Sequence, residues 1–218
     1  MPHQNRVTPW STLLATPERG SLMGNRGCLH DDRQQIRRAF VGKRWILCQL
    51  AFKGRRLPIM APGCYTQLFF LDEATALAAG HRPCAECLRP RFKQFRRLWA
   101  SANPTMSAGA APLATALDEA LHHERISATG EKALHRATLA ELPPGSMVVL
   151  DGSAQPYLVL EHSLRGWSPA DYGEPLPRPA TISVEVLTPR SVVRTLALGY
   201  PVMLHQSALG ETPAAHDI

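Results

Sequence analysis

The chain has 218 residues, of which 44% are hydrophobic and 19% are charged, and this balance is typical of a soluble globular protein with a sizeable core. No run of 18 or more apolar residues occurs, and the N-terminus lacks a basic start followed by an apolar block. We therefore expect neither a transmembrane helix, nor a secretory signal, nor a membrane partner. Five cysteines, an odd number, argue against a disulfide framework and favour the reducing cytoplasm.

Positive charge is concentrated in the first part of the chain. Residues 1–100 contain 17 Lys and Arg against 6 Asp and Glu, a net charge of +11, whereas residues 101–218 contain 7 against 12, a net charge of −5. This asymmetry indicates that the first part meets a polyanion, and we expect nucleic acid, with DNA preferred. Two alternatives stay open: the basic residues are only solvated surface, or the acidic part docks on the basic part.

In chain order, the first predicted elements are short. Residues 1–23 are interrupted by prolines and show no periodicity, which predicts an irregular segment. A short helix is predicted at 33–40. A β-hairpin is predicted at 43–60, with its turn at 53–56, and a third strand is predicted at 65–71.

Two helices with local start and stop signals come next. A short helix is predicted over 73–79, because Asp72 can cap its first turn and Gly80 can end it. Pro90 suits the first turn of the second helix. Aromatic and leucine side chains recur at helical spacing over 92–99 and predict a core-facing stripe with basic residues on the other face.

The remaining elements predict an α+β fold with two domains. The small, uncharged segment 101–114 is the predicted linker. Helices are predicted at 115–128 and 131–141, followed by strands within 146–152, 156–161 and 182–188, and a last helix at 189–199. We therefore expect a basic, zinc-containing N-terminal domain over 1–105, with a β-hairpin and helices, and an acidic domain over 106–218 with helices first and a small sheet after.

A Cys-x-x-Cys pair carries the most specific chemistry in the chain. The spacing of Cys84 and Cys87 lets both thiolates meet one tetrahedral ion, while backbone amides of the turn point at the sulfurs. A redox pair has the same spacing but should open a helix directly after a strand. Here the pair follows a predicted helix that ends at Gly80, so metal binding is favoured.

Zinc needs two further nitrogen or sulfur ligands. We expect them to be Cys48, on the predicted hairpin, and Cys28, in a turn rich in Gly and Asn. His30 is the substitute for Cys28, and Cys64 ranks after these. Zinc is favoured over an iron–sulfur cluster because no other feature marks a cluster.

The segment FFLDEATALAAGHRPCAEC, residues 69–87, resembles the second half of the Ada-type metal-binding domain. That domain occurs in a bacterial DNA alkylation-repair protein and is fused to some nucleases. The matching residues are Phe69, Glu73, Ala74, Ala79, Gly80, Arg82, Pro83, Cys84 and Cys87. The resemblance implies a four-ligand zinc site that touches DNA phosphates.

The chain also departs from the Ada-type pattern. His81 replaces an aromatic residue, and the closely spaced first pair of ligands is absent, because Cys28, Cys48 and Cys64 are spread singly along the chain. The fold around the first half of the site must therefore differ. The methyl-accepting cysteine of the family is assigned to no residue here.

The favoured function is a zinc-binding, nucleic-acid-binding protein of DNA repair or processing. The side chains expected to contact phosphates are Arg33, Arg37, Arg38, Lys53, Arg55, Arg56, Arg89, Arg91, Lys93, Arg96 and Arg97. One alternative is an enzyme: either a metal-dependent nuclease that uses His122 and Glu119, or a repair enzyme whose zinc-bound thiolate accepts an alkyl group. A protein–protein adaptor without a nucleic-acid role is the second alternative.

Overall fold

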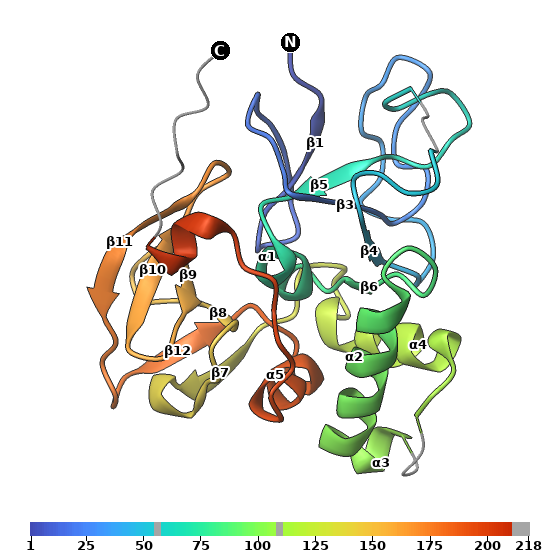
Figure 1. The fold of residues 1–218 in the computed structure, drawn as a ribbon. Helices are drawn as coiled ribbons and strands as arrows, with labels where there is room; N and C mark the ends of the chain where they lie inside the picture. The colour runs from blue at the N-terminus through green and yellow to red at the C-terminus, as the bar shows by residue number, and fades with distance from the viewer. Residues whose placement is uncertain (55–57, 108–110, 211–218) are drawn as a thin grey trace.

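The computed structural model describes residues 1–54, 58–107 and 111–210, and these ranges form a mixed α+β structure with two six-stranded sheets and five α-helices (Figure 1). The predicted α+β class is confirmed. No helix in these ranges is long and apolar enough to cross a lipid bilayer. The domain boundary at residue 105 stays a prediction, and buried clusters contain residues from both sides of it.

The first sheet is built from the N-terminal part of the chain. In spatial order its strands are β2 (Leu13–Ala15), β1 (Gln4–Val7), β5 (Leu68–Phe70), β3 (Leu22–Asn25), β4 (Ile46–Cys48) and β6 (Arg82–Pro83). The pairs β1–β5 and β4–β6 are parallel. The segment 1–23, predicted to be irregular, instead contains β1 and β2, because pairing with the distant β5 decides its conformation.

Two predictions for the segment between β3 and β5 are wrong. No helix forms at 33–40, where the Asp31 carboxylate accepts hydrogen bonds from the backbone N–H groups of Arg33 and Gln35 and holds a turn. Within the described part of 43–60 only β4 is a strand, and it pairs with β3 and β6 rather than with a hairpin partner. Residues 55 and 56 of the predicted hairpin turn lie outside the described residues.

The second sheet is antiparallel throughout. Its strands in spatial order are β11 (Tyr172–Pro177), β10 (Ser163–Trp167), β9 (Pro156–Val159), β8 (Met147–Val149), β12 (Ser183–Val186) and β7 (His135–Thr138). The three predicted strands β8, β9 and β12 are confirmed. The helix predicted at 131–141 is wrong, because β7 pairs with β12 and only the 3₁₀ turn η1 (Leu139–Glu141) follows it.

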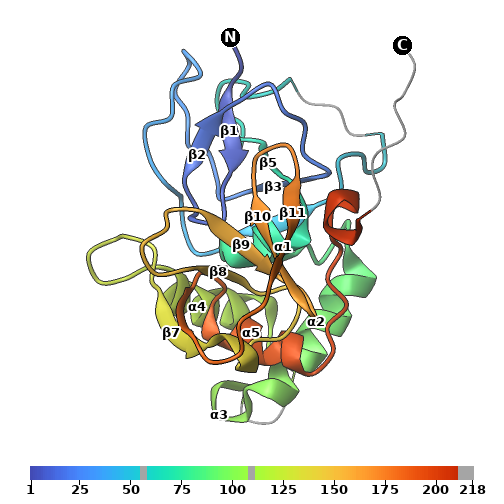
Figure 2. The ribbon, with the colours of Figure 1, turned by 90° about the vertical axis from the view of Figure 1, so that its left-hand side faces the viewer.

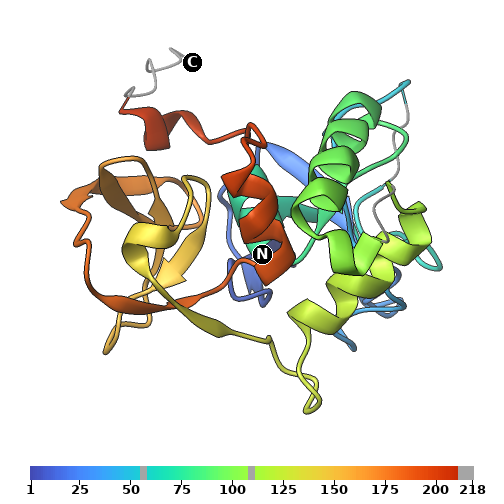
Figure 3. The same cartoon turned by 90° about the horizontal axis from the view of Figure 1, so that it is seen from below.

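Three of the helices lie on the side of the molecule away from the second sheet, and the other two lie between (Figure 1). The helices are α1 (Glu73–Ala78), α2 (Arg89–Ala102), α3 (Pro104–Ser107), α4 (Ala114–Arg125) and α5 (Arg190–Ala197), and the 3₁₀ turn η2 (Gln206–Leu209) comes last. Figure 3 shows α5 between the second sheet and the pair α2 and α4, and Figure 2 shows the first sheet above the second. One buried cluster joins the apolar faces of α2, α4 and α5.

Helix α1 lies at the centre of the molecule and is buried along its whole length. Ala74 and Ala78 pack in the cluster of the second sheet, whereas Ala76 belongs to the cluster of the first sheet. Leu77 packs in the cluster of α2, α4 and α5. Because half of its side chains are alanine, the two sheets and the helices can approach this one helix closely.

Polar groups from α1 itself, from α2 and from later parts of the chain satisfy the N-terminal end of α1. The Asp72 carboxylate accepts hydrogen bonds from the Thr75 backbone N–H at 2.9 Å and from the Tyr172 hydroxyl at 3.0 Å. The Glu73 carboxylate pairs with the Arg91 guanidinium and accepts a hydrogen bond from the Tyr200 hydroxyl at 2.6 Å. Negative charge at this end complements the helix dipole.

Cations satisfy the C-terminal end of α1. The Lys132 ammonium donates to the Ala78 carbonyl at 2.6 Å, and the Arg125 guanidinium donates to the Gly80 carbonyl at 2.8 Å. Gly80 has φ +83°, and a Cβ there would lie 2.5 Å from Cδ of Arg125. Only glycine therefore lets the chain turn this closely against Arg125 into β6.

A buried ion pair holds β6 against α4. Arg82 donates to Asp118 through Nε at 2.9 Å and Nη2 at 2.7 Å, and the two side chains are 3% and 6% exposed. Burial raises the pKa of Asp118, and the guanidinium of Arg82 opposes that shift. The pair is therefore costly to bury, and removing one partner is costlier still because the other charge stays buried.

We expect Asp118→Asn to lower the free energy of unfolding by about 3–5 kcal/mol, because Arg82 keeps its charge without a partner. The exposed pair of Arg136 and Asp151 is the control, and Asp151→Asn should leave stability almost unchanged. Chemical denaturation of the three proteins measures both effects. Equal stabilities for Asp118→Asn and the unaltered chain would show that the pair does not hold β6.

A pH dependence is expected from Lys132. Burial, together with the charges of Arg26 and Arg125, lowers its pKa to about 7. Between pH 7 and its ordinary pKa of 10.5, the unfolded state binds more protons at this residue than the folded state, so stability rises with pH. In Lys132→Met this rise should be reduced. Urea denaturation from pH 7 to pH 10 tests it, and identical slopes in the two proteins would contradict it.

Candidate metal centre

Strand pairing brings Cys48 beside Cys84. In the parallel pair of β4 and β6, Ile46 lies opposite Arg82, and Leu47 lies opposite Pro83. The backbone N–H of Cys84 donates to the Leu47 carbonyl at 2.8 Å and continues this register. The next residues of the two segments are Cys48 and Cys84, so the sheet places their side chains next to each other.

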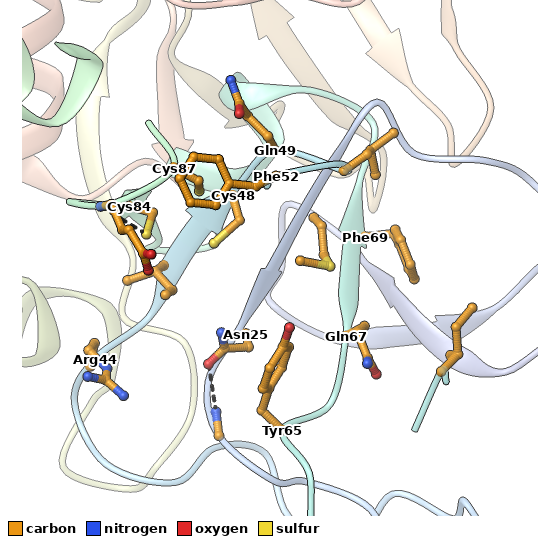
Figure 4. A pocket seen from close by; sticks show the side chains of 16 residues that line it. Asn25, Arg44, Cys48, Gln49, Phe52, Tyr65, Gln67, Phe69, Cys84 and Cys87 are labelled. Carbon is orange, nitrogen blue, oxygen red and sulfur yellow. Dashed lines mark hydrogen bonds between the residues drawn. The ribbon is translucent and has the colours of Figure 1, made fainter. Parts of the chain in front are cut away.

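The turn after β6 adds Cys87. The backbone N–H of Glu86 points at Sγ of Cys84 at 3.4 Å, as expected for a metal-binding turn. The sulfur atoms of Cys48, Cys84 and Cys87 all lie within 4.8 Å of one another. Figure 4 shows the three side chains together. Helix α2 begins at Arg89, two residues after Cys87.

The polar surroundings of the sulfurs favour ionisation of one thiol, that of Cys84, and disfavour it for the other two. A hydrogen bond from the Cys48 thiol, followed by the N–H groups of Glu86 and Cys87, holds the pKa of Cys84 well below its usual range. The same bond and burial raise the pKa of Cys48. Burial raises the pKa of Cys87, whereas the backbone N–H of Gln49 opposes that shift. A cation among the sulfurs would offset the repulsion between three thiolates, so the donors present fit a thiophilic metal ion.

The structure does not bring Cys28 or His30 to these sulfurs. The Cys28 thiol points at the carbonyl of His30 at 3.6 Å. The His30 ring bonds to the Thr66 hydroxyl through Nδ1 at 2.6 Å and to the Ala61 carbonyl through Nε2 at 3.2 Å, so both of its nitrogens are engaged. Cys64 is half-buried and also lies outside the group. Within residues 1–54, 58–107 and 111–210, the centre therefore has three of the four predicted ligands.

A pocket of about 930 Å³ adjoins the cysteines, and sequence reasoning missed it. Alternate residues of three neighbouring strands line this pocket, whereas Leu47 and Leu68, which lie between them, face the core of the first sheet. The lining residues are Met23 and Asn25 on β3, Ile46 and Cys48 on β4, and Gln67 and Phe69 on or beside β5. Figure 4 shows Arg44 and Tyr65 at the same pocket. The period of two along strands was the available signal, but only the sheet order puts these residues on one face.

The basic residues of α2 fall on two sides. Arg89, Lys93 and Arg97, four residues apart, are exposed on one face of the helix. Arg91 and Arg96 turn toward the protein instead. Arg91 pairs with Glu73, as described above, and the guanidinium carbon of Arg96 lies 5.7 Å from the centre of the Phe92 ring.

The remaining predicted phosphate contacts lie in the loops before and after β4. Arg33, Arg37 and Arg38 are exposed between β3 and β4, where Arg37 pairs with Asp31 at 2.6 Å. Lys53 is exposed as well. Residues 55 and 56, which are Arg55 and Arg56, lie outside the described part of the chain.

The structure engages Glu119 and His122 in other contacts. The Glu119 carboxylate pairs with Lys43 and with His123, whose Nε2 lies 3.0 Å away. The His122 ring packs against Phe40 with 5.3 Å between ring centres. These residues form no group of three potential metal ligands within the described ranges. The geometry therefore does not add support to the nuclease interpretation.

No family model matches the chain, and comparisons with curated proteins and with solved structures also give no match. The resemblance of residues 69–87 to the Ada-type domain thus stays a prediction. The geometry of the three cysteines is the observation from which function can be argued.

We expect the purified protein to hold one equivalent of metal, measured by elemental mass spectrometry against protein concentration. Removing a residue that only hydrogen-bonds to a metal ligand lowers metal affinity about 10–100-fold. Cys48→Ser or Cys84→Ser removes a ligand itself, so each should lower the affinity by more than about 100-fold. Cys28→Ser is the matched control and should retain the metal. A loss in Cys28→Ser as large as that in Cys84→Ser would contradict the three-cysteine centre.

Proposed function

We propose that the protein binds one Zn²⁺ ion through Cys48, Cys84 and Cys87 and binds nucleic acid, DNA by preference, through the basic surface beside this centre. The convergence of three thiols from two separate segments, directly before a helix with an exposed basic face, carries the proposal. The resemblance to the Ada-type domain supports a role in DNA repair or processing.

The donor set favours zinc among biological metals. Thiolate sulfur is a soft ligand and selects zinc, copper(I) or iron–sulfur clusters. An iron–sulfur cluster is usually held by four cysteines, whereas three converge here within the described residues. Thiolate ligands also require a reducing compartment, for which we propose the cytoplasm.

The zinc centre would fix the position of α2. Leu88, the residue before the helix, follows Cys87 directly, and its backbone N–H donates to the Cys84 carbonyl at 3.3 Å. An ion bound to Cys48 on β4 and to the turn with Cys84 and Cys87 would therefore hold the start of α2 against β4. The exposed row of Arg89, Lys93 and Arg97, with about 6 Å of helix rise between neighbours, would then face a phosphate backbone as a rigid unit.

We expect the affinity for a short DNA duplex to fall steeply with salt, because each phosphate contact releases counterions. Replacing Arg89, Lys93 and Arg97 together by Gln should reduce the slope of log affinity against log salt by about 3, at roughly 0.9 per contact. Fluorescence anisotropy between about 50 and 200 mM salt measures this slope.

A variant with Arg19, Arg136 and Arg190 replaced by Gln loses the same charge away from α2 and should keep most of the original slope. Affinity that does not change with salt in the unaltered protein would refute phosphate binding. Equal slopes for the two triple variants would instead refute the role of the α2 row.

A second candidate is a repair enzyme in which a zinc-bound thiolate accepts a methyl group. The half-buried Cys84 and Cys87 line the pocket, so a substrate could reach their sulfurs. The sulfur would form a bond to the methyl carbon of a phosphate triester, and the phosphodiester anion would leave. Intact-mass measurement after exposure to methylated DNA tests it, and an unchanged mass would exclude this candidate.

A further inference from the structure

We infer that the fourth coordination position of the metal is open to the pocket of about 930 Å³ and takes a small thiol that carries an anionic group. The inference rests on the zinc centre proposed above. All three cysteines of the centre line this pocket. Within residues 1–54, 58–107 and 111–210, no fourth Cys, His, Asp or Glu ligand atom joins the group at the same mutual distance.

The turn after β4 explains why the chain leaves the position open. The residues after Cys48 can be compared with a metal-binding turn of the Cys-x-x-Cys type, such as the one that holds Cys84 and Cys87. In such a turn the second thiolate comes three residues after the first. The residue three after Cys48 is Ala51, which has no donor atom. The segment after Cys48 therefore supplies one ligand only. The three sulfurs face the pocket, from which a fourth sulfur could complete the coordination of the metal.

The size and lining of the pocket suit a small molecule. Its volume of about 930 Å³ lies in the range of about 300–1,000 Å³ that is typical of ligand sites. Leu50, Phe52, Ile59 and Phe69 supply apolar and aromatic surface, and few charged groups accompany them. A purely structural zinc site is closed by protein ligands and needs no such space.

The chemistry of the centre selects a thiol. Three sulfur ligands make the site soft, so a fourth soft donor binds in preference to oxygen. Two positive charges and four thiolates leave a net charge of −2, which needs a cation nearby. Arg44 lines the pocket, its side chain is exposed, and it forms no ion pair within the described part of the chain. Its guanidinium offsets that charge and can bind a carboxylate of the ligand through two hydrogen bonds.

X-ray absorption at the zinc edge, on the full-length zinc protein, tests the inference. Without added thiol we expect three sulfur neighbours and one oxygen or nitrogen neighbour. With glutathione, a thiol that carries carboxylates, we expect four sulfur neighbours. S-methylglutathione keeps the carboxylates and lacks the thiol, so it should leave three.

Cobalt substitution gives the affinities, because each new cobalt–sulfur bond adds charge-transfer absorbance. Arg44→Gln should weaken glutathione binding about tenfold, since a hydrogen bond between charged groups is lost. The same variant should bind 2-mercaptoethanol, a thiol without charge, as the unaltered protein does. Arg19→Gln, which removes an exposed arginine that does not line the pocket, should leave both affinities unchanged.

The outcomes separate this inference from the zinc proposal. A protein without zinc refutes both. Zinc with four sulfur neighbours before any thiol is added keeps the zinc proposal and overturns this inference, because a further cysteine of the chain then closes the site. An unchanged number of sulfur neighbours after glutathione is added also overturns the inference. Equal weakening of glutathione and 2-mercaptoethanol binding in Arg44→Gln overturns it as well, because Arg44 then does not recognise an anionic group on the ligand.

Discussion

Burial of the short helix α1 is the constraint on which the rest of the structure depends. A helix exposes unpaired N–H and C=O groups at its ends, and burying such groups without partners costs free energy. Here partners come from distant parts of the chain. At the N-terminal end the Met203 carbonyl accepts from the Glu73 N–H, and Tyr172 and Tyr200 donate to the two carboxylates there. At the C-terminal end Lys132 and Arg125 donate to the carbonyls. The two sheets and the helical layer thus meet around one element, and its polar ends determine how they meet.

The metal centre follows from this arrangement. Gly80 turns the chain out of α1 against Arg125, and the next residues pair as β6 with β4, which places Cys84 beside Cys48. One face of the first sheet packs on α1, and the other face lines the pocket. A ligand in this pocket would therefore contact one face of a sheet whose other face packs in the protein core. The site would be rigid, because β4, which carries Cys48, is paired with β3 on one side and with β6 on the other.

The net charge of the N-terminal part overstates the cations available to a partner. Arg26 is buried on the Trp45 ring, with its guanidinium carbon 4.4 Å from the ring centre, and Arg125 of the later part packs against the same ring at 4.2 Å. Burial, together with the charge of Arg125, lowers the pKa of Arg26 to about 9. Arg82 is also buried, in its pair with Asp118. The exposed row on α2 remains, as do exposed basic residues in the loops around β4, and we propose that the α2 row makes the phosphate contacts.

The sequence by itself determined the elements whose signals are local. Asp72 and Gly80 mark α1, Pro90 marks the start of α2, and the spacing of Cys84 and Cys87 indicates a metal-binding turn. Only the tertiary structure decided that residues 135–138 form a strand, that Cys48 and not Cys28 completes the cysteine group, and that a pocket adjoins it. The physical reason is range: caps and turns are satisfied by neighbouring residues, whereas strand pairing and the convergence of ligands depend on contacts between segments far apart in the chain.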